Sequence, residues 1–170
     1  MKKSVFIPPP PIEPGPGQES VWDYPRPPKL EWTTVSLRVV AMGATIAHTR
    51  RGCRVLETSH PPVYYFPPDD VSARLLIPAP GISMCEFKGA ARYWTICVDG
   101  KYFVKAAWSF PEPTPRYKAI AGYIAFYASR VDSCWVGEER AQAQQGDFYG
   151  GWVTSGIVGP FKGGPDTSGW

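Results

Sequence analysis

The chain has 170 residues, a length typical of one compact domain that can bury a sizeable core without metals or disulfides. Its net charge is only +3 and its basic residues are scattered, which argues against nucleic-acid binding. Arg50, Arg51 and Arg54 are assigned to a solvated face. No apolar run approaches the length of a membrane span, and prolines from Pro8 to Pro11 end the first apolar stretch too early for a signal peptide. We therefore expect a cytoplasmic protein that binds neither membranes nor nucleic acid.

Proline and aromatic residues are unusually numerous, with 20 Pro, 7 Trp, 9 Tyr and 8 Phe. Proline is poorly tolerated inside helices and central strands, so the secondary-structure elements are expected to be short. Tyr and Trp combine a large apolar body with a polar group. This combination suits a core that surrounds a small ligand site.

Residues 1–33 form a Pro- and Gly-rich arm in which Trp22, Tyr24 and Trp32 supply apolar anchors. Proline favours extended, polyproline-like chain. We interpret the second half of the arm as a strap that packs on the domain, and we expect residues 1–17 to be loose.

Residues 34–136 show a series of short strand patterns separated by turn residues. Apolar Val35, Leu37 and Val39 alternate with polar residues, which predicts the first strand. The Asp99-Gly100 pair is a hairpin signal. Further strands are predicted at 44–49, 53–57, 63–66, 73–77, 91–98, 102–105, 106–110, 123–127 and 131–136, with a turn at 78–81 and brief helical turns at 69–71 and 116–121.

Residues 137–170 are rich in glycine but also carry large rings at regular intervals. Flexible linkers lack such anchors, so this tail is expected to pack on the domain. Many short strands and almost no helix predict a mainly β fold, either a sandwich or a barrel-like pair of sheets.

Several motif blocks follow one another in the central part of the chain. They are Tyr64–Val71, Cys85–Trp94, Ala107–Pro113 and Gly122–Tyr127. In these blocks, residues from about 35 to 135 resemble the bacterial family catalogued as domain of unknown function (DUF) 427. The family's central motif usually has Thr-x-Cys-Pro, then an aromatic residue and Lys-Gly; here Ser83 replaces the Thr and Glu86 replaces the Pro. The arm and the tail resemble a longer subset of the family.

The resemblance implies an antiparallel two-sheet β-tent (Mss4-like) architecture with one or two short helical turns. Many β-tent proteins hold zinc on Cys-x-x-Cys knuckles, which are absent here, so we expect no metal and no cofactor. The family is sometimes labelled nucleotidyltransferase-like, but the sequence has neither a P-loop nor a carboxylate cluster for Mg²⁺. Free, buried thiols are expected in a reducing compartment for Cys53, Cys85, Cys97 and Cys134.

Five residues of these motif blocks and their flanks are the candidates for a ligand site: Glu57, Tyr65, Lys88, Tyr93 and Trp108. Rings alternate between the two faces of a strand, and we assign Tyr65, Tyr93 and Trp108 to the inner face. Glu57 and Lys88 would supply polar contacts to the ligand. Plain core packing of the rings and a structural Lys88–Glu57 ion pair are the simpler alternatives. The leading hypothesis is a small-molecule-binding domain.

An enzyme is the alternative, with Cys85 or Lys88 as nucleophile or base. The Lys88 ammonium would favour the Cys85 thiolate, and a lysine among rings can act as a base or form a Schiff base. His60, which precedes two prolines, is expected to be structural or exposed. A third hypothesis is a protein-interaction or structural module that uses the arm or the tail. The identity of the small molecule and homo-oligomer formation are left open.

Overall fold

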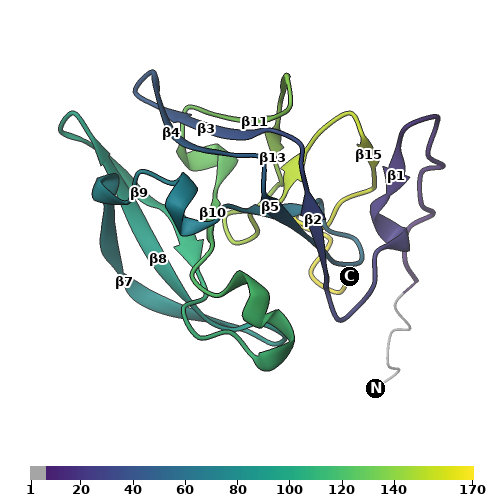
Figure 1. The fold of residues 1–170 in the computed structure, drawn as a ribbon. Coiled ribbons are helices and arrows are strands. Elements are labelled where there is room, and N and C mark those ends of the chain that lie inside the picture. Colours follow the sequence, from purple (N-terminus) through teal and green to yellow (C-terminus); the bar gives the residue numbers. More distant parts are fainter. Residues whose placement is uncertain (1–6) are drawn as a thin grey trace.

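The computed structural model describes residues 7–170 and consists of strands connected by loops and short 3₁₀ turns (Figure 1). One sheet has the order β10-β9-β8-β7, with β7 at Leu76–Cys85, β8 at Gly89–Val98, β9 at Lys101–Ser109 and β10 at Ile124–Phe126. A second has the order β12-β11-β3-β4, with β3 at Leu37–Ala41, β4 at Ala44–Thr49, β11 at Ser133–Val136 and β12 at Glu139–Arg140. The third, β2-β5-β6, comprises β2 at Lys29–Thr33, β5 at Gly52–Leu56 and β6 at Val63–Tyr65.

Two further strand pairs tie the ends of the described chain to this framework. β1 (Glu19–Ser20) pairs in parallel with β15 (Ile157–Val158), and β13 (Gln142–Ala143) pairs antiparallel with β14 (Trp152–Val153). The 3₁₀ turns are η1 at Val21–Asp23, η2 at Pro68–Asp70, η3 at Ala73–Leu75, η4 at Pro115–Ile120 and η5 at Ala128–Arg130.

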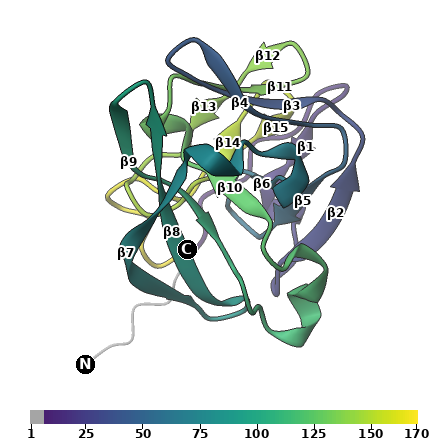
Figure 2. The ribbon, with the colours of Figure 1, turned by 60° about the vertical axis from the view of Figure 1, so that its left-hand side comes forward.

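The mainly β, antiparallel character predicted from the sequence is confirmed. All pairings within the three larger sheets are antiparallel, and in a second view β7–β9 lie on one side of the molecule with β2 and β5 on the other (Figure 2). The strands divide among more sheets than the two that were expected. The likeness to the β-tent architecture stays a prediction.

Several local predictions are wrong for a physical reason. The residues from Pro78 to Gly81 lie inside β7 and do not form a turn. Among the described strands β7 is an edge strand that pairs only with β8, which leaves room for Pro78, and a register shift between Ala79 and Ile82 accommodates Pro80. Residues 73–75 form the 3₁₀ turn η3 in place of a strand. β9 also continues through Lys105, where a left-handed residue with φ of 48° accompanies an irregularity opposite β8.

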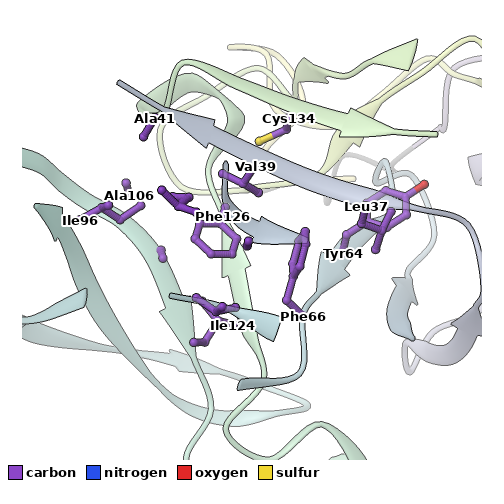
Figure 3. Close-up of a cluster of buried hydrophobic side chains, with 14 of the residues drawn as sticks. Leu37, Val39, Ala41, Tyr64, Phe66, Ile96, Ala106, Ile124, Phe126 and Cys134 are labelled. Carbon is purple, nitrogen blue, oxygen red and sulfur yellow. The ribbon is translucent and has the colours of Figure 1, made fainter. Parts of the chain in front are cut away.

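The larger core cluster fills the space between the first two sheets. Leu37, Val39 and Phe126 are fully buried there, and Phe66 meets Phe126 edge to face with ring centroids 5.4 Å apart (Figure 3). Val35, predicted to share the inner face with Leu37, lies before β3 and is 47% exposed. Burying large rings contributes about 1.5–3 kcal/mol each and explains the richness in aromatics.

A second core cluster lies on the other face of β6. Successive strand residues point to opposite faces, so Tyr64 joins the larger cluster while its neighbour Tyr65 joins the second one. Trp108 and Phe110 from the end of β9 pack beside Tyr65. This second cluster forms the floor of the cavity described below.

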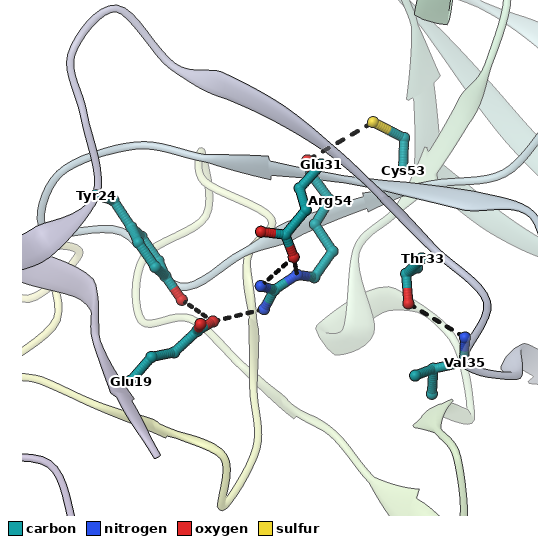
Figure 4. A network of polar contacts seen from close by, with 7 residues as sticks. All are labelled: Glu19, Tyr24, Glu31, Thr33, Val35, Cys53 and Arg54. Carbon is teal, nitrogen blue, oxygen red and sulfur yellow. Dashed lines mark hydrogen bonds and ion pairs between the residues drawn. The ribbon is translucent and has the colours of Figure 1, made fainter. Parts of the chain in front are cut away.

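The arm is fastened to the third sheet by Arg54 of β5 (Figure 4). The Arg54 side chain is only 15% exposed; its Nη1 lies 2.6 Å from Glu19 Oε1, and its Nε donates to Glu31 Oε1 at 2.9 Å. The Tyr24 hydroxyl donates to the same Glu19 oxygen at 2.6 Å. The assignment of Arg54 to a solvated face is therefore wrong, because the arm covers it.

Replacing this buried guanidinium should weaken the fold. Arg54→Met leaves Glu19 and Glu31 without their shared cation, and we expect a loss of about 1–3 kcal/mol in the free energy of unfolding, because both carboxylates keep partial access to water. Denaturant titration measures it. Arg51→Met is the matched control, since Arg51 pairs with Asp70 but is 64% exposed, and its loss should cost clearly less than the loss of Arg54. Equal effects of the two substitutions would contradict the role given to Arg54.

Candidate functional site

A cavity of about 350 Å³ opens between the second core cluster and the C-terminal tail. Its wall takes residues from the ends of β5 and β6, from β8 and β9, and from the turn between β7 and β8. The structure brings all the sequence-derived candidates to this one cavity: Glu57, Tyr65, Cys85, Lys88, Tyr93 and Trp108. Their role in binding stays a prediction.

Hydrogen bonds hold the rings of the wall in place. The Trp108 indole N–H donates to the Tyr65 hydroxyl at 3.3 Å, and the Trp108 ring lies 4.5 Å from that of Tyr127. The Tyr93 hydroxyl is hydrogen-bonded to Ser83 Oγ at 2.5 Å. Burial raises the pKa of Tyr65, which is 1% exposed, so it remains a phenol with its own hydrogen to donate.

Glu57 supplies the carboxylate of the cavity, and its partners are Arg26 and His60. Arg26 Nη2 lies 3.2 Å from Glu57 Oε2, and His60 Nε2 lies 3.5 Å from the same oxygen. The ion pair expected between Lys88 and Glu57 is not formed among the residues that the structure describes. Arg26 of the arm takes that place, a pairing that no local pattern indicates.

His60 is locked in one tautomer by Gln144 of the tail. The Gln144 Oε1 accepts from the Gly151 N–H at 3.1 Å, and its Nε2 donates to the Lys162 carbonyl at 2.7 Å. The amide nitrogen therefore faces His60 Nδ1, 3.2 Å away, so Nδ1 must accept and Nε2 must carry the hydrogen. Burial lowers the pKa of His60 to about 3, with further lowering by Lys162, Arg26 and Lys88. His60, expected from the sequence to be structural or exposed, is buried and lines the cavity.

Three cations share the region around His60. Arg26 is paired with Glu57, and the Lys162 ammonium donates to a main-chain oxygen of Trp170 at 3.0 Å. Lys88 is half-buried, and its ammonium lies 5.6 Å from the centroid of the Phe110 ring. Within residues 7–170 the Lys88 ammonium forms neither an ion pair nor a hydrogen bond. Among the described residues, the cavity therefore carries one cation without a polar partner.

The four cysteines differ in burial: Cys53 and Cys134 are buried, whereas Cys85 and Cys97 are half-buried. All four are free, and burial raises the pKa of the Cys53 thiol to about 11. Cys85 is half-buried on the cavity wall, where its thiol makes no hydrogen bond to another described residue. Across residues 7–170, no three His, Cys, Asp or Glu side chains gather in a way that would hold a metal ion. Nor does that part of the chain contain a helix long and apolar enough to cross a membrane.

The sequence reasoning missed the cavity residues that come from the arm and the tail. Gly150 shows how the tail fits: a Cβ at this position would lie 2.1 Å from the Trp108 ring, so the tail backbone lies directly on that ring. The sequence feature that could have indicated this contact is the Phe148–Gly151 segment, in which two aromatic residues precede two glycines. The missed residues of the arm and the tail are Arg26, Gln144, Phe148, Tyr149, Gly150, Lys162 and Trp170, and those of the domain itself include His60 and Tyr127.

Comparison with known proteins adds one finding. A protein-family model described as Domain of unknown function (DUF427) matches residues 29–137. A search of curated proteins finds no match. The matched segment covers more than half of the chain and contains all five ligand-site candidates, whereas Arg26, Gln144 and Lys162 lie outside it. The chain therefore belongs to the DUF427 family.

Proposed function

We propose that the protein is a small-molecule-binding β domain whose ligand occupies the cavity walled by Tyr65, Tyr93 and Trp108. The observation that carries the proposal is the combination of a concave, ring-lined space with a few fixed polar groups. Binding sites for small molecules have this make-up and volumes of about 300–1,000 Å³. The cavity, at about 350 Å³, lies at the lower end of that range.

The size of the cavity limits the ligand. One ring with a small polar substituent fits this volume. The lack of a P-loop in the sequence argues separately against nucleotidyl transfer.

Binding explains the polar groups better than catalysis does. A thiol nucleophile needs an adjacent base or cation, yet the Cys85 thiol has no hydrogen-bond partner among the described residues. The one histidine of the cavity is neutral, and both of its nitrogens are engaged, with Gln144 and Glu57. Among the described residues, His60 and Glu57 are thus engaged with other groups and do not serve Cys85 as a base.

The test is ligand-observed NMR with a panel of single-ring compounds, comparing the wild-type protein with Tyr93→Leu. Tyr93 is half-buried on the wall, and losing its ring and hydroxyl should weaken binding by about fivefold or more. Tyr102→Leu is the control, since Tyr102 is 62% exposed and lies outside the cavity wall. The proposal fails if no compound binds the wild-type protein at millimolar concentration, or if Tyr93→Leu binds the panel as well as the control does.

A further inference from the structure

We infer that the ligand is a small aromatic monoanion, with a carboxylate that pairs with Lys88 and a ring that lies against Trp108 and Tyr93. The inference rests on the proposed function and names its ligand class. Three observations support it: the partners of the charged groups in the cavity, the hydrogen bonds that fix the turn of Lys88, and the Tyr65 hydroxyl, whose hydrogen no described residue accepts.

The charged groups that the structure describes around the cavity leave one cation free for a ligand. Glu57 is engaged by Arg26 at 3.2 Å and faces the His60 N–H. Lys162 already donates to a main-chain oxygen. Glu86, the other carboxylate on the wall, is solvent-exposed. Lys88 is half-buried against Phe110 and has no such partner in the described chain, so a bound anion would give it one.

The turn that carries Lys88 is held in place by the segment after β9. The Lys88 carbonyl accepts from the Thr114 N–H at 3.1 Å, and the Thr114 hydroxyl donates to the Phe87 carbonyl at 2.6 Å. Gly89, with φ of 101°, provides the left-handed residue that the turn needs. The main chain is thus positioned before a ligand arrives, which reduces the entropy lost on binding.

The Tyr65 hydroxyl provides a second donor. It accepts from Trp108, but no described residue accepts its own hydrogen. Tyr65 is 1% exposed and lies on the cavity wall, so a ligand oxygen is a natural acceptor for it. The Lys88 ammonium and the Tyr65 hydroxyl have no acceptor among the described residues. Both can donate to one carboxylate of a ligand, or one can donate to the carboxylate and the other to an oxygen on the ligand's ring. A phosphate dianion usually draws on more donors and on a bidentate arginine, and Arg26 is already paired with Glu57.

The charged groups around His60 indicate the sign of the local field. A histidine 3.5 Å from a carboxylate would ordinarily hold its proton more tightly, yet burial and the three cations together keep this one neutral. Three cations, Lys162, Arg26 and Lys88, act on this point, together with the carboxylate of Glu57. An anion that enters the cavity meets a favourable potential.

The experiment compares benzoate with benzamide, which have nearly the same shape and differ in charge. We expect benzoate to bind the wild-type protein at least tenfold more tightly than benzamide, as measured by ligand-observed NMR titration, and phenyl phosphate to bind more weakly than benzoate. Lys88→Met should remove the preference for benzoate while benzamide binding remains, and Lys88→Arg should retain the preference. Lys101→Met is the control, because Lys101 is exposed and lies outside the cavity wall.

The outcomes separate this inference from the proposed function. If benzamide binds as tightly as benzoate, and both are weakened in Tyr93→Leu, the cavity binds small molecules but the inference is wrong. Tighter binding of phenyl phosphate than of benzoate also overturns it. A benzoate preference that survives in Lys88→Met removes Lys88 from the site. If no ring compound binds the wild-type protein, the proposed function itself fails.

Discussion

Replacing Gly150 with alanine is expected to destabilise the protein by about 1–3 kcal/mol, the usual cost of overpacking a well-filled interior. The added Cβ would lie 2.1 Å from one carbon of the Trp108 ring and 2.6 Å from the next. Trp108 cannot simply move aside, because it is hydrogen-bonded to Tyr65 and packed against Tyr127. The clash must therefore displace the tail from the cavity wall or disrupt the ring cluster. Denaturant titration gives the change in the free energy of unfolding.

Gly156→Ala is the matched control in the same tail. Its Cβ would find its nearest neighbour, the Thr154 hydroxyl, at 3.7 Å, and the change in stability should stay within about 0.5 kcal/mol. A second test is a double-mutant cycle with Trp108→Phe, whose smaller ring leaves room for the new methyl group. Gly150→Ala should cost clearly less in that background. An equal cost in both backgrounds would mean that the clash with Trp108 is not the cause.

Local sequence patterns were sufficient for many of the strands. Alternation and flanking turn residues located β4 at residues 44–49, and the Asp99-Gly100 signal corresponds to a turn in which both residues have positive φ, 47° and 77°. The same reasoning failed at Pro78 and Pro80, since proline is excluded from central strands but accepted on an edge strand. Whether a strand lies at an edge depends on the whole sheet order, which the local sequence does not contain.

The site shows the same division between local and long-range information. Tyr65, Tyr93 and Trp108 could be assigned to one side from alternation along their strands. The partner of Glu57 could not be predicted, because Arg26 reaches it from the arm and many lysines and arginines were equally available in the sequence. Gln144 likewise acts on His60 only after the tail has folded back over β6. Polar pairing between distant segments is decided by the assembled fold.

The second large effect is a loss of stability on mild acidification, caused by His60. Its pKa is about 6.5 in the unfolded chain and about 3 in the folded protein, because it is buried and surrounded by Lys162, Arg26 and Lys88. Between about pH 3 and pH 6.5, the His60 side chain is protonated in the unfolded chain but neutral in the folded protein. The contribution of His60 to the free energy of unfolding is therefore fully present above about pH 6.5. It decreases as the pH falls below this value, by about 1.4 kcal/mol per pH unit. From pH 7 to pH 5 the free energy of unfolding should drop by about 2 kcal/mol.

The two histidines of the chain make this prediction separable, because His48 is exposed while His60 is 7% exposed. His60→Asn keeps an acceptor for Gln144 but cannot titrate, so its unfolding free energy should be nearly constant from pH 7 to pH 5, whereas His48→Asn should retain the wild-type slope. Asp70, whose pKa the hydrogen bonds from Arg51 and Thr49 lower, titrates below this window. A slope that persists in His60→Asn would refute the assignment.

Protonation of His60 would place an N–H against the Gln144 amide nitrogen, which Gly151 and Lys162 hold in orientation. The acid sensitivity is thus the cost of the same contacts that fix the tail onto the cavity wall.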